Sequence, residues 1–388
     1  MTRTYDPLAA VQAAGPPGTI SFVYGLPDPT TFPAEELRQA ADEVLRVRAS
    51  LALQYGPEQG YGPLIDYLIA KIARDEGLQL DRPQMMLTAG SAAALDLVCT
   101  LFTRPGDRVL VEAPTYHESL QLMRDHWLIP HQIAMDAEGL RPEAMAEVLR
   151  NLSRRGDRAS FLYTIPSFQN PSGITLASVR RAEVLRLAAE YDLLIVEDDV
   201  YRDLAYEAQP PPSFYALDAG KRVLRIGSFS KILAPGVRMG WLIAAPDQLT
   251  RLVGCGLLSM GGGANPLMAN LLATYCRQGL LEPHIELLRS AYRERRDLAL
   301  RALASHMPEG VRWTHPGGGF FLWISLPEPM RSSDVAERAR RAGLWIPSGD
   351  PFFAEEPAGQ CLRLAFSYVA PDLIVQGIEK LAQIVRGI

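Results

Sequence analysis

Short apolar runs alternate with amphipathic stretches through the middle of the chain. Seven runs have the length and composition of strands, at 85–89, 108–113, 131–135, 160–165, 193–197, 222–228 and 240–245. Between several of them lie stretches with helical periodicity, at 91–103, 117–126, 141–150 and 176–190. This alternation predicts an α/β fold with a mostly parallel, seven-stranded sheet. Ligands bind beyond the carboxyl ends of such strands, so functional residues are expected there.

The pattern changes towards the C-terminus. A long helical pattern at 282–303 is followed by two antiparallel strands within 310–327, a helix at 334–342, a strand at 360–367 and a closing helix at 371–387. We therefore expect an N-terminal segment (1–49), a large domain (50–290) and a smaller α+β domain (291–388). The N-terminal segment, rich in Pro and Gly, is expected to pack against the smaller domain.

Composition excludes several classes of protein. The 388 residues carry a net charge of -5, which gives no general attraction to nucleic acid or acidic membranes. No apolar run approaches the roughly 18 residues of a membrane span, and the N-terminus lacks a secretory signal. The six histidines lack ligand spacing, so no metal is expected. The four cysteines form no CxxC motif and indicate reduced, buried thiols of a cytoplasmic protein.

One strand ends in a lysine preceded by two hydroxyls. Ser228, Ser230 and Lys231 close the run at 222–228, and Arg238 lies seven residues further on. Lysine forms an imine with an aldehyde. Hydroxyls and a guanidinium bind a phosphate dianion. These residues thus suit a phosphorylated aldehyde. A polar loop with a solvated lysine is the alternative.

Two further polar segments follow strands. Asp198, in the acidic segment 197–201, could hold a pyridine nitrogen protonated, and Tyr201 could bond the phenolic oxygen of the same ring. An ordinary acidic loop or a magnesium site are the alternatives. The segment 166–173 contains Asn170, whose amide could bind a ligand oxygen, although most Pro- and Gly-rich stretches of this kind are simple turns.

Three weaker signals complete the set. Ser91 and Ala92 open a helix whose N-terminus could bind phosphate through backbone N–H groups, but Ser91 equally fits a plain N-cap. Tyr116 could stack on an aromatic cofactor or simply pack. Arg363 interrupts an apolar strand and needs a partner, either a substrate carboxylate or a structural ion pair.

Together, the motifs SFSK-x6-R, N-P-x-G, E-D-D-x-Y and L-R-L-x-F resemble the fold-type-I pyridoxal-phosphate (PLP) aminotransferases, class I/II. The aminoadipate, kynurenine and aromatic aminotransferase subgroup is the most similar. The resemblance runs from Gly25 to the final helix. It implies PLP as cofactor and an amino acid and a 2-oxo acid as substrates.

The resemblance also implies a role for each residue. Lys231 is the Schiff-base lysine and proton carrier, Asp198 pairs the pyridine nitrogen, and Tyr116 stacks on the ring. The remaining implied contacts are with the ring O3′ (Tyr201, Asn170), the phosphate (Ser91, Ala92, Ser228, Ser230, Arg238, and Tyr55 from the neighbouring subunit) and the substrate (Arg363, Asn170, Gly25). A shared site of this kind implies a homodimer. The bonds Ala113–Pro114 and Asn170–Pro171 match two cis bonds of the family.

The substrate side chain is less defined. Tyr24 stands where the family often has glycine, and it puts a ring near the substrate. The segment 6–14, which often covers the substrate in this subgroup, has no Arg or Lys but offers Leu8 and Val11. We therefore expect aromatic or bulky apolar donors, with 2-oxoglutarate as acceptor by family analogy. A PLP lyase, decarboxylase or oxidase remains an alternative. A transcriptional regulator is disfavoured, because the enzyme-like pattern begins within about 20 residues of Met1.

Overall fold

The seven apolar runs form strands of one large sheet. The computed structural model describes residues 18–218 and 220–388. The described residues contain an eight-stranded sheet, and its strands run in the order β2 (Met85–Thr88), β9 (Gly240–Ile243), β8 (Val223–Ser228), β7 (Leu194–Asp198), β6 (Ala159–Thr164), β3 (Arg108–Ala113), β4 (Ile129–Asp136) and β5 (Gly139–Leu140). The prediction of a mostly parallel sheet is confirmed. The two-residue strand β5 adds an eighth strand to the seven that were expected.

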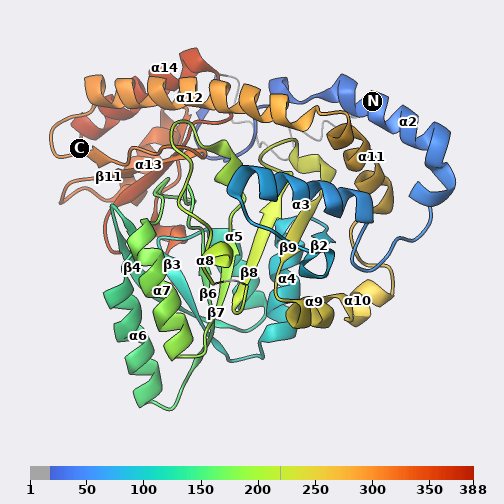
Figure 1. The fold of residues 1–388 in the computed structure, drawn as a ribbon. Coiled ribbons are helices and arrows are strands. Elements are labelled where there is room, and N and C mark those ends of the chain that lie inside the picture. Colours follow the sequence, from blue (N-terminus) through green and yellow to red (C-terminus); the bar gives the residue numbers. More distant parts are fainter. Residues whose placement is uncertain (1–17, 219) are drawn as a thin grey trace, which may run out of the picture.

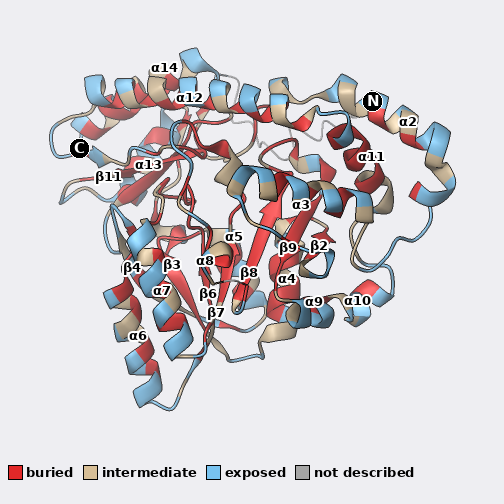
Figure 2. Ribbon diagram, viewed as in Figure 1, coloured by how far each residue is buried: buried red, intermediate tan, exposed pale blue. Residues whose placement is uncertain are grey.

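Most neighbouring strands of the large sheet run parallel, and the antiparallel pairs lie towards its two edges. The pairs β8–β7, β7–β6, β6–β3 and β3–β4 are parallel, whereas β9 runs antiparallel to both β2 and β8. The short β5 turns back on β4. The central strands are buried along their length (Figure 2). Burial on both faces explains why the sequence shows continuous apolar runs there rather than alternation.

Helices cover this sheet, and their outer faces are exposed (Figures 1 and 2). The predicted helices form as α4 (Ser91–Phe102), α5 (His117–Asp125), α6 (Pro142–Arg154) and α7 (Ser178–Glu190). Short helices follow at α8 (Phe214–Asp218), α9 (Pro246–Val253) and α10 (Gly256–Ser259). The remaining helices of this part are α2 (Ala34–Ala52), α3 (Gly62–Glu76) and α11 (Pro266–Arg277).

The C-terminal elements gather at one end of the molecule, in orange and red in Figure 1. The long helix α12 (Leu281–His306) leads to a three-stranded antiparallel sheet in the order β10 (Arg312–Trp313), β11 (Phe321–Ser325) and β13 (Cys361–Ala365). The helices α13 (Ser332–Arg341) and α14 (Pro371–Arg386) pack together beside it. This arrangement matches the α+β pattern expected from the sequence.

The N-terminal segment reaches this end of the molecule. Its strand β1 (Ile20–Ser21) pairs in parallel with β12 (Leu344–Trp345). The predicted domain limits at 49/50 and 290/291 fall inside helices α2 and α12, and the division into domains stays a prediction. Residues 6–14, including Leu8 and Val11, lie outside the described residues. Of the four free cysteines, Cys255 is only partly buried, contrary to expectation.

Sheet order decides which strand ends meet. The adjacent strands β8, β7, β6 and β3 end at Ser228, Asp198, Thr164 and Ala113. Because parallel strands end at one edge of a sheet, the polar segments that follow them converge there. The bonds Ala113–Pro114 and Asn170–Pro171 in this region are both cis, as predicted, and Glu328–Pro329 is a third cis bond. No helix in the described ranges combines the length and hydropathy needed to cross a membrane.

Candidate active site

A cavity of about 460 Å³ opens at this edge of the sheet. Twelve of the fourteen residues predicted for the site line it: Tyr24, Gly25, Ser91, Ala92, Tyr116, Asn170, Asp198, Tyr201, Ser230, Lys231, Arg238 and Arg363. The two exceptions are Ser228 and Tyr55. Residues distant in sequence thus share one cavity because the strand ends and the C-terminal sheet converge.

Lys231 follows strand β8 and lies inside the cavity. Its Nζ donates to the carbonyl oxygen of Gly25 at 3.4 Å and lies 5.8 Å from the ring centre of Tyr201. Burial lowers the pKa of Lys231 to about 8, and the negative charge of Asp198 acts in the opposite direction. About a tenth of the amine is therefore uncharged at pH 7 and about half at pH 8, far more than for an ordinary lysine, and the uncharged form is the one that a nucleophile or proton carrier requires.

Gly25 allows the chain beside Lys231 to pack closely against Phe321. A Cβ built at Gly25 would lie 2.2 Å from the ring of Phe321, well inside van der Waals contact. Any side chain at position 25 would have to displace that buried ring. Tyr24 and Leu26, on either side of Gly25, both line the cavity.

Asp198 ends strand β7 and faces the same cavity. The Tyr163 hydroxyl donates to its Oδ2 at 2.6 Å, whereas its Oδ1 is buried and has no hydrogen-bond partner among the described residues. Burial raises the pKa of Asp198 to about 6; nearby Asp199 also raises it, while the Tyr163 hydrogen bond and Lys231 lower it. A buried acceptor without a partner is unfavourable. A ligand that presents an N–H to Oδ1 would remove this penalty.

Two tyrosines shape the cavity on different sides. Tyr116 immediately precedes helix α5, and its ring lies edge-on to His117 at a centroid distance of 5.8 Å. Tyr201 is buried and packs edge-on against Phe320 at 5.4 Å and Phe321 at 5.9 Å. Burial raises the pKa of both hydroxyls, so they remain protonated hydrogen-bond donors at neutral pH.

Arg363 brings the C-terminal sheet into the cavity. It sits in the middle of β13, and its Nη1 donates to Asn170 Oδ1 at 3.1 Å while Nη2 donates to the carbonyl oxygen of Val23. The guanidinium lies over the rings of Phe321 and Phe352, at 4.8 and 4.7 Å. Burial lowers the pKa of Arg363 to about 10, which leaves it cationic at neutral pH.

Arg363 forms no ion pair with a carboxylate of the described residues, although its place in an apolar strand predicts a partner for its charge. Its contacts there are neutral oxygens and two aromatic rings, and its Nε has no hydrogen-bond partner. A buried cation without a counter-ion favours an anionic ligand. The ion-pair alternative is therefore not what the described residues contain.

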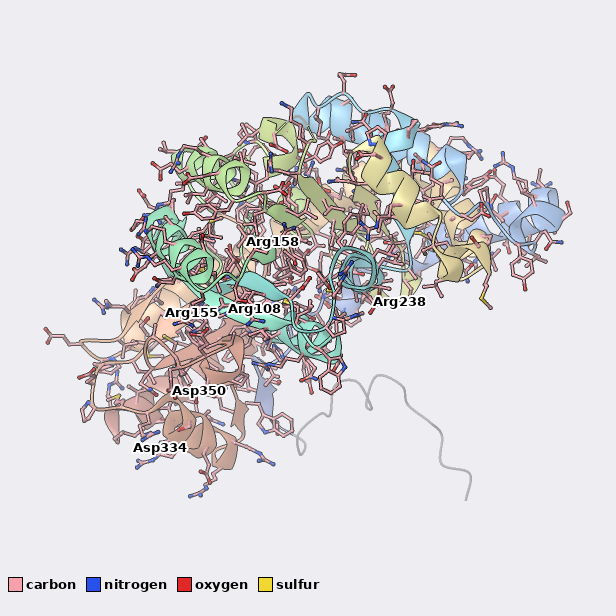
Figure 3. The ribbon with its side chains drawn as sticks, turned by 90° about the horizontal axis from the view of Figure 1, so that it is seen from below. Arg108, Arg155, Arg158, Arg238, Asp334 and Asp350 are labelled. Atoms are coloured by element: carbon pink, nitrogen blue, oxygen red, sulfur yellow. The ribbon has the colours of Figure 1, made fainter. Side chains whose placement is uncertain are left out.

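Backbone groups and Arg238 form another wall of the cavity. Helix α4 begins at Ser91 after Gly90, which has a positive φ of 91°. The positive φ favours glycine at this position, and a Cβ there would also come within 2.7 Å of Nη2 at the flexible end of Arg238. Arg238 itself donates to the carbonyl oxygen of Ala89 at 3.3 Å. In Figure 3 it lies well apart from Asp334 and Asp350 of the C-terminal part. This corner, with a helix N-terminus and a cation, suits an anion.

Ser228 and Tyr55 lie outside the cavity. The Ser228 hydroxyl accepts the N–H of Ser230 at 3.0 Å and thereby shapes the turn that carries Lys231. Tyr55 is 81% exposed and borders a separate hollow of about 540 Å³ with Leu53 and Leu258. Within one subunit Tyr55 is thus remote from the other candidate residues.

Several lining residues carried no clear signal in the sequence. Tyr163 lies within the mostly apolar run of strand β6, so its hydroxyl gave no sign of a functional role. The pairing of β6 with β7 brings that hydroxyl to Asp198. Glu118 lies in the first turn of helix α5 and lines the cavity. Its Oε2 lies 3.0 Å from Nδ1 of His117. Aliphatic residues add the rest of the wall, including Val23, Leu95, Leu122 and Ile165. No group of three or more potential metal ligands occurs within the described ranges.

Comparison with known proteins agrees with this site. The family "Aminotransferase class I and II" matches residues 25–381. The aromatic-amino-acid aminotransferase 1 of Thermococcus litoralis is 38% identical over 95% of this chain and 88% of its own length. The 2-aminoadipate transaminase of Thermus thermophilus is 35% identical over 96% and 91%.

A solved structure shows the same fold. The kynurenine aminotransferase of Pyrococcus horikoshii, crystallised with PMP, superposes with a TM-score of 0.92 at 38% identity, covering 99% of this chain and 95% of that one. The chain belongs to the class I and II aminotransferases. It is an enzyme of fold type I that depends on PLP.

The residues present fit this cofactor. The partnerless Asp198 Oδ1 can accept a pyridinium N–H, and Lys231 supplies an amine that is partly uncharged. The corner formed by α4 and Arg238 suits a phosphate. When bound, PLP supplies an electron-withdrawing ring and the carbonyl group that takes up the amino group.

Proposed function

We propose that this enzyme transfers the amino group of an aromatic or bulky apolar L-amino acid to a 2-oxo acid such as 2-oxoglutarate. The observation that carries the donor assignment is the charge of the cavity. Its described lining contains three Lys or Arg residues: Lys231, Arg238 and Arg363. Cofactor and α-carboxylate engage all three in this proposal, so the described lining offers no further Lys or Arg for a carboxylate in the donor's side chain.

The remaining wall supports the same assignment. Tyr24 and aliphatic side chains surround the space beside Lys231, and the one additional charged carboxylate, Glu118, would repel an acidic side chain. Burying an apolar side chain against such a wall stabilises the complex by about 25 cal/mol per Å² removed from water. The choice of 2-oxoglutarate rests on family resemblance and not on the cavity.

Each cavity residue receives a role in this proposal. Lys231 would hold PLP through its amine and would carry the proton that moves between the substrate Cα and the cofactor C4′. Asp198 keeps the ring nitrogen protonated, Tyr116 packs on the ring, and Tyr201 and Asn170 bond its O3′. The phosphate contacts are Ser91, Ala92, Ser228, Ser230 and Arg238, with Tyr55 from the partner subunit. Arg363 and Asn170 bind the α-carboxylate beside Gly25 and Tyr24.

Initial rates with a donor panel test the substrate assignment. Phenylalanine, leucine, kynurenine, aspartate and 2-aminoadipate would each be assayed with 2-oxoglutarate, pyruvate and phenylpyruvate as acceptors. We expect the highest kcat/KM for the first three donors. A tenfold advantage for aspartate or aminoadipate would refute the apolar-pocket assignment.

Borohydride reduction of the holoenzyme tests the role of Lys231. It should fix the cofactor to a peptide containing Lys231; a label on Lys71, Lys221 or Lys380 would overturn that role.

A homodimer is part of the proposal. Several large apolar side chains near Tyr55 are exposed on the single chain, including Leu51 (54%), Leu53 (67%), Leu257 (54%) and Met260 (86%). Exposed apolar groups that gather on one surface favour a protein interface. A second copy of the chain would cover them and bring Tyr55 to the neighbouring cavity. The four free cysteines support a reducing, cytoplasmic location.

A further inference from the structure

A buried carboxylate beneath the cavity takes no part in the roles assigned above. Glu112 lies near the end of strand β3, is 1% exposed and does not line the cavity. Its Oε1 accepts the hydroxyl of Thr164 at 2.6 Å. Its Oε2 accepts the N–H of Ile165 at 3.1 Å and the amide of Gln169 at 3.0 Å. Both carboxylate oxygens are therefore occupied by donors from strand β6 and from the loop that follows it.

Gln169 extends this contact to a second loop. The other N–H of its amide donates to the carbonyl oxygen of Pro114 at 2.6 Å. Its Oε1 accepts both the N–H and the hydroxyl of Ser172, at 2.9 and 2.6 Å. Gln169 is also buried, at 1% exposure. The pair Glu112–Gln169 thus joins the segment after β3 to the segment after β6.

Those two segments carry residues of the candidate active site. Tyr116 lies two residues beyond Pro114, and Asn170 is the neighbour of Gln169. Asn170 in turn accepts the hydrogen bond from Arg363 Nη1 at 3.1 Å. Movement of the first segment would displace Tyr116, and movement of the second would displace Asn170 and its hydrogen bond with Arg363.

Stability alone does not account for a carboxylate at position 112. Burial raises the pKa of Glu112, which reflects the cost of a charge in the interior. Apolar residues of similar volume often serve stability as well as a buried charged group does. The three donors that converge on Glu112 indicate instead that it fixes the geometry of its partners.

We infer that Glu112 and Gln169 are positioning residues that hold Tyr116, Asn170 and Arg363 in the arrangement needed to bind the cofactor ring and the substrate carboxylate. This inference rests on the proposed roles of those three residues. Glu112 and Gln169 would then serve binding although both are buried and neither lines the cavity.

Substitutions at Glu112 separate hydrogen bonding from charge and shape. Glu112→Gln can keep every contact, because its oxygen can accept from Ile165 and Gln169 while its amide donates to the Thr164 hydroxyl. Glu112→Met has a similar length but leaves three buried donors without an acceptor. We expect the Gln variant to stay within about threefold of the wild type and the Met variant to lose about tenfold or more in kcat/KM, since small misplacements of reacting groups are costly.

Two binding measurements accompany the kinetics. The apo-enzyme is titrated with PLP, and the holoenzyme with 3-phenylpropionate, a carboxylate that lacks the amino group. Both dissociation constants should rise about tenfold or more in Glu112→Met and change little in Glu112→Gln. Equal values in the wild type and a folded Met variant would overturn the inference. Equal impairment of the Gln and Met variants would also overturn it, because charge would then matter rather than hydrogen bonding.

Gln169 provides an independent test if Glu112→Met does not fold. Gln169→Met should reproduce the binding losses. Gln169→Glu places a second carboxylate against Glu112, and its activity relative to the wild type should improve as pH falls from 8 to 6, since a shared proton restores a donor. A pH-independent ratio would contradict the inference. A wild-type enzyme inactive on every donor would instead refute the proposed function.

Discussion

At the scale of single residues, burial sets the chemistry of the cavity. It lowers the pKa of Lys231 to about 8 and raises that of Asp198 to about 6. The two shifts have the same cause, loss of water around the charged form, and they act in opposite directions because one group is a cation and the other an anion. At pH 7 the pair still holds a mostly charged amine next to a mostly ionised carboxylate.

The first prediction follows from the lysine. The uncharged amine is the nucleophile, so the rate at which apo-enzyme attaches PLP at saturating cofactor should rise through pH 8 and level off above pH 9. With a pKa of about 8, the uncharged fraction increases roughly fivefold between pH 7 and pH 8. The measurement is the change in visible absorbance after mixing. Asp198→Asn removes a charge that raises this pKa, so its midpoint should move to lower pH.

A rate that keeps rising towards pH 10 would contradict this prediction. That result would mean that the amine of Lys231 behaves as an ordinary solvated lysine, whose pKa is about 10.4.

The second prediction concerns Arg363. Two parallel hydrogen bonds from a planar guanidinium suit a carboxylate better than a single ammonium does. Arg363→Lys should therefore raise KM for donor and acceptor alike, by about tenfold or more. Titration with PLP serves as the control and should change little. A rise in KM for one substrate only would show that Arg363 does not bind the group common to both.

At the scale of elements, loops between strands and helices are held by side chains from the helices they enter. Arg181 on helix α7 is the clearest example, with 0% exposure. It donates to the carbonyl oxygens of Leu176 at 3.2 Å, Pro166 at 2.9 Å and Pro212 at 3.0 Å. One arginine thus ties together both ends of the loop that contains Asn170.

The third prediction tests this tie. Arg181→Met leaves several buried carbonyls without donors and should reduce the free energy of unfolding by about 3 kcal/mol or more. Arg186→Met is the matched control, because Arg186 lies on the same helix, is 67% exposed in its side chain and, within 18–218 and 220–388, forms an ion pair with Glu190 alone. Its effect should stay within about 0.5 kcal/mol. Urea midpoints measured on both variants make the comparison, and equal midpoints would contradict it.

At the scale of the whole molecule, the single chain leaves apolar surface exposed, and the predicted site residue Tyr55 is exposed outside its cavity. Tyr55 and Leu53 border a different hollow from the one that contains Lys231, and Leu257 and Met260 are exposed as well. A symmetric pair buries the same surface on both copies. The two observations lead to the same proposal, an enzyme with two cavities that each depend on both subunits.

The fourth prediction uses hybrid dimers. Tyr55→Phe and Lys231→Ala chains should each be impaired, but a dimer with one of each has one cavity with both residues intact. Random mixing should restore roughly a quarter of wild-type activity, because half the dimers are hybrids with one good site of two. Mixing Lys231→Ala with Arg363→Ala should restore none, since both residues belong to one chain's cavity. Full activity of a monomer at low concentration would refute the shared site.

The sequence by itself determined the strands, most helices and the polar segments at the strand ends. These features depend on local spacing: apolar runs of strand length, helical periodicity and turn residues such as those of 166–173. The motif around Lys231 and Arg238 is also local, and both residues line the cavity as expected. Strands, helices and turns follow from interactions between residues close in sequence, so they can be predicted without knowing the order of strands in the sheet.

Only the tertiary structure decided which of these segments meet. Tyr163 reaches Asp198 because β6 lies beside β7, and Gln169 reaches Glu112 because β6 lies beside β3. Arg363 meets Asn170 across 193 positions of sequence. The order of strands in the sheet differs from their order in the chain, so contacts of this kind follow from global packing. For the same reason the sequence left the partner of Arg363 undecided between an ion pair and a ligand, whereas in the described structure its hydrogen bonds and ring contacts are all with neutral groups.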